Sequence, residues 1–232
     1  MEYAAWVRNW PWELWGQPVY SLQANTVWGV ELLLRSARYR RLAPTAILGD
    51  AAVNGLLGTL EAEIFHAAVQ THVAEGLQRL INISAAGLRR LDPGRHEVND
   101  AILEITEQEP GGIELVDLLN AWRRRGARIA VDDVGSGYGR LAALVYWKPE
   151  LVKVDRPLVS DIHADPVKQA VLEGLQKIAY ALGARLVAEG IETEQELQYL
   201  RSAGVPLGQG FLFGLPMPVY HFEEVSTIAS SG

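Results

Sequence analysis

The chain has 232 residues, a formal net charge of -7 and a pI near 5.3. An acidic chain is a poor general ligand for a DNA or RNA duplex or for an anionic membrane surface, so we expect neither as a partner. The absence of cysteine excludes disulfides, thiolate metal sites and a cysteine nucleophile.

The length suits one barrel-sized domain, and we expect a single domain over residues 1–232. Its first part, residues 1–16, is rich in tryptophan (Trp6, Trp10, Trp12 and Trp15) and lacks the features of a signal peptide. No apolar run reaches the length of a spanning helix, so we expect a cytoplasmic protein. The tryptophan rings are expected to pack on the barrel floor, with a partner or dimer surface as the alternative.

A hairpin is predicted next. The segments GQPVYSL and TVWGVELLLR flank the turn residues Gln23, Ala24 and Asn25, so one strand should run antiparallel to its neighbours. Helical spacing follows over residues 46–57 and 58–76.

Strands and helices alternate over the rest of the chain. The predicted strands are 79–84, 101–106, 128–132, 151–155, 185–189 and 207–213, and the predicted helices are 113–125, 166–182, 193–203 and one from about 219. Gly183 should end the second of these helices, and Thr193 with Glu196 forms a capping box before the third. This alternation predicts a parallel sheet covered by helices, and the one-to-one match of helices with strands favours closure into a barrel.

Polar residues close the apolar runs. They are Glu31, Asn82, Glu104, Asp132 with Asp133, Lys153, Glu189 and Gln209. The gaps between them fit one βα unit each, except the first, which fits two. Because the carboxyl ends of barrel strands meet at one mouth, the spacing predicts a single site rich in carboxylates. Such a site suits divalent metal and phosphate-like charge.

Adjacent strand residues point to opposite faces, so Asp132 and Asp133 can share a site only if the strand ends at Asp132 and the chain then turns. Two carboxylates this close predict a pair of metal ions, Mg²⁺ or Mn²⁺, since all the candidate ligands are hard oxygen donors. A loop or helix-capping role for Asp133 is the alternative.

Lys153 is flanked by valines that should face the helices, so its ammonium should point into the barrel, with Asp155 as a plausible partner. Glu189 should face the mouth as a general base or a water-holding acid. Glu192 could equally be a residue that favours a helix N-terminus, and Asn82 could equally begin a turn. We assign no catalytic role to the histidines.

The motifs, taken together, resemble the EAL-domain family of cyclic-di-GMP phosphodiesterases. The matching segments are QPV at 17–19, ELLLR at 31–35, NIS at 82–84, LEITE at 103–107, VDDVGSGY at 131–138, VKVDR at 152–156, VAEGIET at 187–193 and GQGFLFGLP at 208–216. The resemblance implies a modified TIM (β/α)8 barrel with one antiparallel strand. It also implies hydrolysis of cyclic di-GMP, a bacterial second messenger in signal transduction, to linear pGpG by a homodimer.

The resemblance also implies a role for each site residue. The first metal ion would be bound by Glu31, Asn82, Glu104 and Asp132, and the second by Asp132 and Asp133. The catalytic set would be Lys153 and Glu189, which hold and activate the water, Gln209 near that water, and Glu31. Substrate would contact Gln17 and Arg35, and the loop after Asp133, which links dimerisation to metal binding, would be braced by Glu107 and Glu192, with Asp155. Three residues depart from the family pattern: Leu32, Val134 and Ser36. None of them removes a ligand, so they bear on affinity and regulation.

Two other functions compete with the phosphodiesterase. A receptor would bind cyclic di-GMP without cleaving it, although such receptors usually lose metal ligands. An enolase-like or aldolase-like barrel would use Lys153 as a base or Schiff-base former, but it would not explain the order of the motifs.

Overall fold

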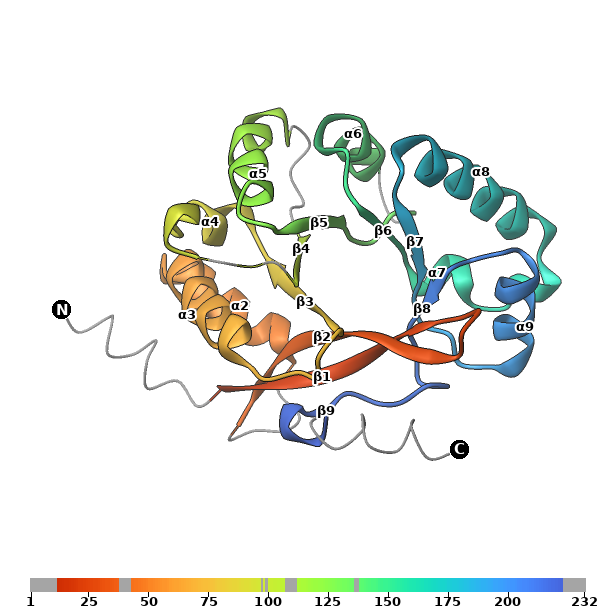
Figure 1. Cartoon of the computed structure of the whole chain (residues 1–232), viewed down its shortest axis with the longest axis horizontal. Coiled ribbons are helices and arrows are strands. Elements are labelled where there is room, and N and C mark those ends of the chain that lie inside the picture. Colours follow the sequence, from red (N-terminus) through yellow and green to blue (C-terminus); the bar gives the residue numbers. More distant parts are fainter. Residues whose placement is uncertain are drawn as a thin grey trace.

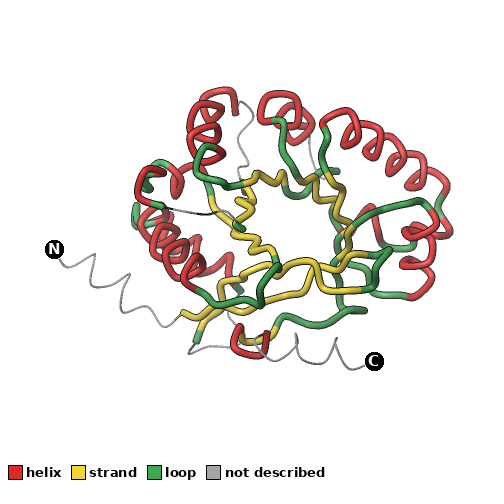
Figure 2. Tube along the Cα trace, in the orientation of Figure 1, coloured by secondary structure: helices red, strands yellow, loops and turns green. Residues whose placement is uncertain are grey.

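The structure is a computed structural model that describes residues 12–37, 43–96, 98, 100–106, 112–135 and 138–222. Its strands close into a barrel with helices around the outside (Figure 1 and Figure 2). The order in the sheet is β2-β3-β4-β5-β6-β7-β8-β1-β9, and β1 also pairs with β2, which closes the ring. Trp6, Trp10 and Glu107 lie outside the described residues.

The predicted hairpin forms the seam of the barrel. β1 (Trp12–Ser21) runs antiparallel to β2 (Thr26–Ser36) on one side and to β8 on the other. Asn25 ends the turn with a positive φ of 56°, a conformation that asparagine tolerates. The predicted modified TIM barrel with one antiparallel strand is therefore confirmed. A short strand β9 (Met217–Pro218) pairs antiparallel with Trp15 and Gly16 of β1.

The other strands are parallel to one another. They are β3 (Gln78–Ile83), β4 (Ala101–Ile105), β5 (Arg128–Val131), β6 (Leu151–Val154), β7 (Arg185–Ala188) and β8 (Leu207–Gly208). The prediction that the last strand reaches residue 213 is wrong. Ile191 donates its N–H to the Gln209 carbonyl, and a Cβ on Gly210 would lie 2.1 Å from the Ile191 oxygen. This close approach turns the chain out of the sheet after Gly208.

Helices cover the outside of the ring (Figure 2). They are α2 (Pro44–Val53), α3 (Leu57–Gln70), α4 (Ala85–Leu88), α5 (Val116–Arg123), α6 (Tyr138–Trp147), α7 (Arg156–Val159), α8 (Pro166–Leu182) and α9 (Glu194–Ser202). Short 3₁₀ turns cover Pro93–Arg95 (η1), Gly112–Leu115 (η2), Ile162–Ala164 (η3) and Val219–His221 (η4).

The predicted bounds of α8 are confirmed, with Gly183 in the left-handed conformation after it, and so is the capping box of α9. The helix predicted over 113–125 is a 3₁₀ turn followed by the shorter α5, and the one predicted over 58–76 ends at Gln70. The helix predicted from 219 begins as a 3₁₀ turn and then passes outside the described residues.

The barrel interior has three levels because inward side chains alternate along each strand. The middle level is an apolar ring of Val19, Leu80, Ile102, Ala130, Leu151, Val187 and Leu207, each at most 1% exposed. Outward residues such as Leu32, Val152 and Val154 pack in the core beneath the helices. One step beyond the ring, at the carboxyl ends of the parallel strands, the inward residues are polar.

Candidate active site

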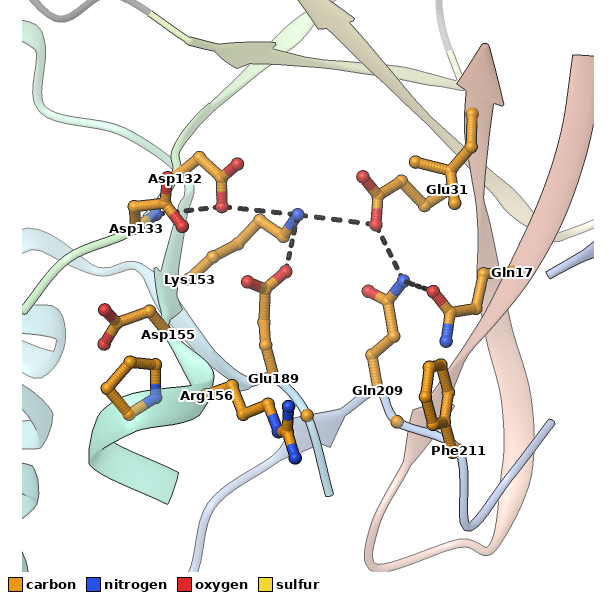
Figure 3. Close-up of a pocket in the computed structure, with 14 residues that line it drawn as sticks. Gln17, Glu31, Asp132, Asp133, Lys153, Asp155, Arg156, Glu189, Gln209 and Phe211 are labelled. Atoms are coloured by element: carbon orange, nitrogen blue, oxygen red, sulfur yellow. Dashed lines mark hydrogen bonds and ion pairs between the residues drawn. The ribbon is translucent and has the colours of Figure 1, made fainter. Parts of the chain in front are cut away.

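The mouth of the barrel gathers the polar residues that close the strands. Two residues past the apolar ring lie Asn82, Glu104, Asp132, Lys153, Glu189 and Gln209, and Gln17 and Glu31 complete the level from β1 and β2. Figure 3 shows several of these side chains converging on one pocket. The pocket has a volume of about 510 Å³. The strand spacing therefore predicted the gathering of these side chains correctly.

Lys153 is the centre of the cluster. Its Nζ lies 2.7 Å from Glu189 Oε1, 2.9 Å from Glu104 Oε1, 3.5 Å from Asp132 Oδ1 and 3.6 Å from Glu31 Oε2. Burial alone would lower the pKa of Lys153, but these four carboxylates raise it well above its ordinary value. The ammonium is therefore held protonated. A Schiff-base lysine needs the opposite shift, so the geometry does not support the aldolase-like alternative.

Burial is the largest influence on the pKa of two of these carboxylates, and it raises both. Desolvation raises the pKa of Glu189 to about 8, with Asp132 and Glu31 adding to the rise and Lys153 opposing it. Desolvation also raises the pKa of Glu104 well above its usual range. One ammonium therefore does not offset the cost of burying both carboxylates in their charged form, and a further cation would.

Glu31 is held from two sides by amides. Asn82 Nδ2 donates to Glu31 Oε1 at 2.8 Å, and Gln209 Nε2 donates to Glu31 Oε2 at 2.7 Å and to Gln17 Oε1 at 3.0 Å. Because a carboxylate only accepts hydrogen bonds, the Gln209 amide must turn its nitrogen toward Glu31. Gln209 Oε1 is then left buried without a hydrogen-bond partner among the described residues.

Asp132 and Asp133 reach the same site because the strand stops before them. β5 ends at Val131, and Asp133 adopts a left-handed φ of 52°. This turn lets the Asp133 N–H donate to Asp132 Oδ1 at 2.9 Å. One carboxylate oxygen each from Asp132, Asp133 and Glu189 lies within 4.8 Å of the others. The predicted turn after Asp132 thus brings both aspartates to the mouth.

The residues present suit divalent cations. Five carboxylates (Glu31, Glu104, Asp132, Asp133 and Glu189) gather here, and their described ion pairs are to Lys153 and Arg140. Glu104 Oε2 is fully buried and accepts no hydrogen bond from a described residue, so it can serve as a ligand atom. The donors are carboxylate and amide oxygens, which magnesium and manganese prefer.

The structure places other predicted residues at or beyond the rim. Asp155 is not among the four carboxylates that approach Lys153, and the predicted pairing of these two residues is wrong. β6 ends at Val154, so Asp155 leaves the strand and lies beside Gly135, where an added Cβ would come 2.8 Å from Asp155 Oδ1. Asp155 therefore does lie under the loop that follows Asp133. Val134 is fully buried, and its N–H donates to the Lys153 carbonyl.

Glu192 and Arg35 lie farther from the centre. Glu192 Oε2 accepts from the Arg156 guanidinium at 2.9 Å, so its described ionic contact is with α7. Arg35 is half-buried, its guanidinium donates to the Leu34 carbonyl, and it is outside the residues that line the pocket.

The sequence reasoning missed four residues of the site and its surroundings. Arg156 and Phe211 line the pocket, and Phe211 is 58% exposed there. The buried Glu61 of α3 accepts from the Ser84 hydroxyl at 2.5 Å and its N–H at 3.2 Å, which fixes the chain just after Asn82. Arg140 contacts Asp133. Because none of them closes an apolar run, the strand-end pattern could not find them.

A profile of the EAL domain matches residues 12–216. The chain belongs to the EAL family. NbdA of Pseudomonas aeruginosa, named a cyclic di-GMP phosphodiesterase, is 32% identical over 91% of this chain and 30% of its own length. PdeG of Escherichia coli, named a probable cyclic di-GMP phosphodiesterase, is 30% identical over 92% of this chain and 46% of its own length. The chain therefore spans less than half the length of these relatives.

Solved EAL structures share the fold. The EAL enzyme Bd1971, with cAMP and cyclic di-GMP bound, superposes with a TM-score of 0.83 at 25% identity, covering 97% of this chain and 68% of that one. BlrP1 of Klebsiella pneumoniae, in complex with manganese and cyclic di-GMP, gives a TM-score of 0.73 at 27% identity, covering 90% and 57%. Within the part of the chain that the structure describes, no helix is both long and apolar enough to span a bilayer.

Proposed function

We propose that this EAL domain is a metal-dependent phosphodiesterase that hydrolyses one bond of cyclic di-GMP to give linear pGpG. The observation that carries the proposal is the arrangement around Lys153, where a protonated ammonium and an uncompensated set of oxygen donors share one pocket. Membership of a family whose relatives are named cyclic di-GMP phosphodiesterases supports the same substrate.

The proposed ligands of a first Mg²⁺ or Mn²⁺ ion are Glu31, Asn82, Glu104 and Asp132, and those of a second ion are Asp132 and Asp133. Bound divalent ions would neutralise the phosphate and lower the pKa of a coordinated water. Their number and identity belong to this proposal, and the manganese in the BlrP1 complex supports it.

The chain's own residues would hold the attacking water and take its proton. Lys153 can donate a hydrogen bond to the water oxygen, and Glu189 lies 2.7 Å from the same ammonium, close enough to accept the proton. The free Oε1 of Gln209 can accept a second hydrogen bond from the water. Gln17 and Arg35 would contact the substrate at the rim.

Incubation of the purified chain with cyclic di-GMP and Mg²⁺ or Mn²⁺, followed by chromatography, tests the proposal. We expect pGpG with either metal and none after chelation by EDTA. Binding of intact nucleotide without product under both metals would assign the chain to the receptor alternative. The variant Gln209→Glu is a useful companion, because a sixth carboxylate, placed next to Glu31, should slow turnover while the barrel remains intact.

We also propose that the working form is a homodimer, built on the neighbouring helices α6 and α8. On α6, Leu141, Val145 and Tyr146 are 47%, 66% and 48% exposed, and on α8, Val167 and Val171 are 71% and 44% exposed. Residues four apart lie on one helix face, so each helix presents an apolar stripe outward. The two helices lie next to each other around the barrel (Figure 1). A second copy of this chain would bury both stripes.

The dimer would support the segment 133–140, because this segment ends in the first turn of α6. In the same proposal, Glu107 and Glu192 brace the loop after Asp133. We also propose that residues 1–232 form a single domain. Sedimentation of wild type and Val145→Glu, with specific activity measured on the same samples, tests it. We expect Val145→Glu to be monomeric and less active per subunit, and an exposed Val53→Glu on α2 to serve as the control. Activity that stays flat across the monomer–dimer transition would contradict the coupling.

A further inference from the structure

Arg140 is a cation that approaches the mouth from a helix and contacts Asp133. It lies in the first turn of α6, and its side chain is only 15% exposed. The guanidinium extends toward the barrel, where Nη1 donates to the Ile105 carbonyl at 3.3 Å and Nη2 lies 3.8 Å from Asp133 Oδ2. One side chain from the outer helix thus reaches the ends of β4 and β5.

Both strand ends carry proposed metal ligands. Ile105 directly follows Glu104, and Asp133 belongs to the three-carboxylate group with Asp132 and Glu189. Lys153 approaches Asp132 and Glu189 from inside the barrel, as Figure 3 shows for Glu189. Arg140 approaches the third member, Asp133, from the helix side. Each carboxylate of the group therefore has a protein cation within 4 Å.

Asp133 interacts directly with the Arg140 charge. The guanidinium charge lies 3.8 Å from the Asp133 carboxylate, so it compensates part of the negative charge that Asp132 and Asp133 bring together. An arginine is always charged, so it supplies this compensation at any working pH. A divalent ion bound at Asp132 and Asp133 would supply the same compensation and would repel the guanidinium.

We propose that the Arg140 guanidinium is a fixed positive charge beside the second metal position. It weakens binding of the second divalent ion, and it holds the Asp132–Asp133 turn in place while that ion is absent. The inference rests on the proposed metal-dependent function and adds a determinant of metal affinity supplied by this chain. Arg140 is next to the exposed Leu141 on α6. A shift of that helix would therefore move the Arg140 guanidinium relative to Asp133.

Manganese binding to the complete chain, measured by calorimetry without substrate, tests the proposal. Arg140→Gln and Arg140→Met remove the charge but keep much of the side chain. Each should bind Mn²⁺ about tenfold more tightly than wild type at the weaker site, because a competing positive charge 3.8 Å from a ligand oxygen has been removed. Arg140→Lys keeps the charge and should stay close to wild type. The matched control is Arg156→Gln, because Arg156 lines the same pocket but its guanidinium is exposed and pairs with Glu192. It should change affinity far less.

Thermal unfolding gives a second measure that does not depend on turnover. Without metal, both charge-removing variants should melt below wild type, and saturating Mn²⁺ should raise their melting temperature by more than it raises that of wild type. Equal or weaker Mn²⁺ binding by both variants would overturn the inference, because it would mean that Arg140 does not oppose the ion. Wild type that binds no Mn²⁺ at all would instead contradict the proposed function, and this inference with it.

Discussion

The two ends of the barrel interior are built on the same strands and differ in the charge they carry. At the mouth, the carboxylates are Glu104 of β4, Asp132 directly after β5 and Glu189 directly after β7. At the floor, four residues earlier on β5 and β7, the inward residues are Arg128 and Arg185. The apolar ring lies between them.

The floor residues are held by packing. Trp28 occupies a bulge in β2, where Val19 pairs with Gly29 and Tyr20 with Val27, and the bulge turns its ring onto the apolar level. The Arg185 guanidinium stacks 4.8 Å from the centre of that ring, and Arg128 donates to Gln78. At the mouth, by contrast, Glu104 and Gln209 keep buried oxygens free for a ligand. The floor therefore contributes to stability, and the mouth is prepared for chemistry.

The largest expected effect of a substitution is on turnover at the mouth. Glu31→Ala and Lys153→Ala should each lower kcat by about 10²–10⁴-fold, because each removes a group proposed to hold metal or water. Glu31→Ala should also weaken Mg²⁺ binding, whereas Lys153→Ala should still allow a complex of metal and nucleotide. Steady-state rates with cyclic di-GMP, together with calorimetry, check both. Near-native rates in either variant would show that its assigned role is wrong.

The next effect concerns stability at the floor. Trp28→Ala should lower the free energy of unfolding by about 3 kcal/mol, since it empties the space beneath the apolar ring and removes the stacking surface of Arg185. Urea denaturation measures the loss. The folded fraction should keep a native kcat, and a large drop in kcat per folded molecule would end the division between floor and mouth.

A smaller effect should appear in the pH dependence of the metal-free protein. Burial raises the pKa of Glu189 to about 8, so between its ordinary pKa and pH 8 the folded chain holds a proton that the unfolded chain has lost. Stability should therefore fall as pH rises toward 8. Glu189→Gln should flatten this slope in melting curves recorded with EDTA from pH 5 to 9. A slope equal to that of wild type would show that Glu189 is not the source.

The smallest effect is expected for Arg185→Gln at the floor. Its guanidinium is half-buried and interacts with the Trp28 ring, so the loss should be about 0.5–1 kcal/mol of unfolding free energy. Burial and the neighbouring Arg128 charge both lower the pKa of Arg185. Removing the Arg185 charge therefore relieves its repulsion with Arg128, which offsets part of the loss. Urea denaturation next to Trp28→Ala measures the difference, and kcat should not change. A loss as large as that of Trp28→Ala would show that Arg185 stabilises the floor as much as the Trp28 ring does, and would contradict this ranking.

Much of the architecture could be predicted because it depends on local patterns. The bounds of α8 follow from helical spacing between Asp165 and Gly183, and the start of α9 follows from Thr193 and Glu196. The hairpin follows from two alternating segments around a turn ending at Asn25. The end of β8 could not be predicted in this way, since the chain continues into the apolar residues Phe211, Leu212 and Phe213. Close approach of Gly210 to Ile191, from another loop, decides where that strand stops.

The sequence by itself determined which residues reach the mouth, because the period of two along a strand and the length of a βα unit are local properties of the chain. Only the tertiary structure decided which of them touch. Lys153 pairs with Glu189 and Glu104 and not with Asp155, although Asp155 is nearer in sequence, because the strand ends between the two. Arg140 reaches Asp133 from a helix, and Trp28 turns inward at a bulge. Contacts between side chains of different elements depend on where each strand ends and on how each helix packs, which the closed barrel as a whole sets.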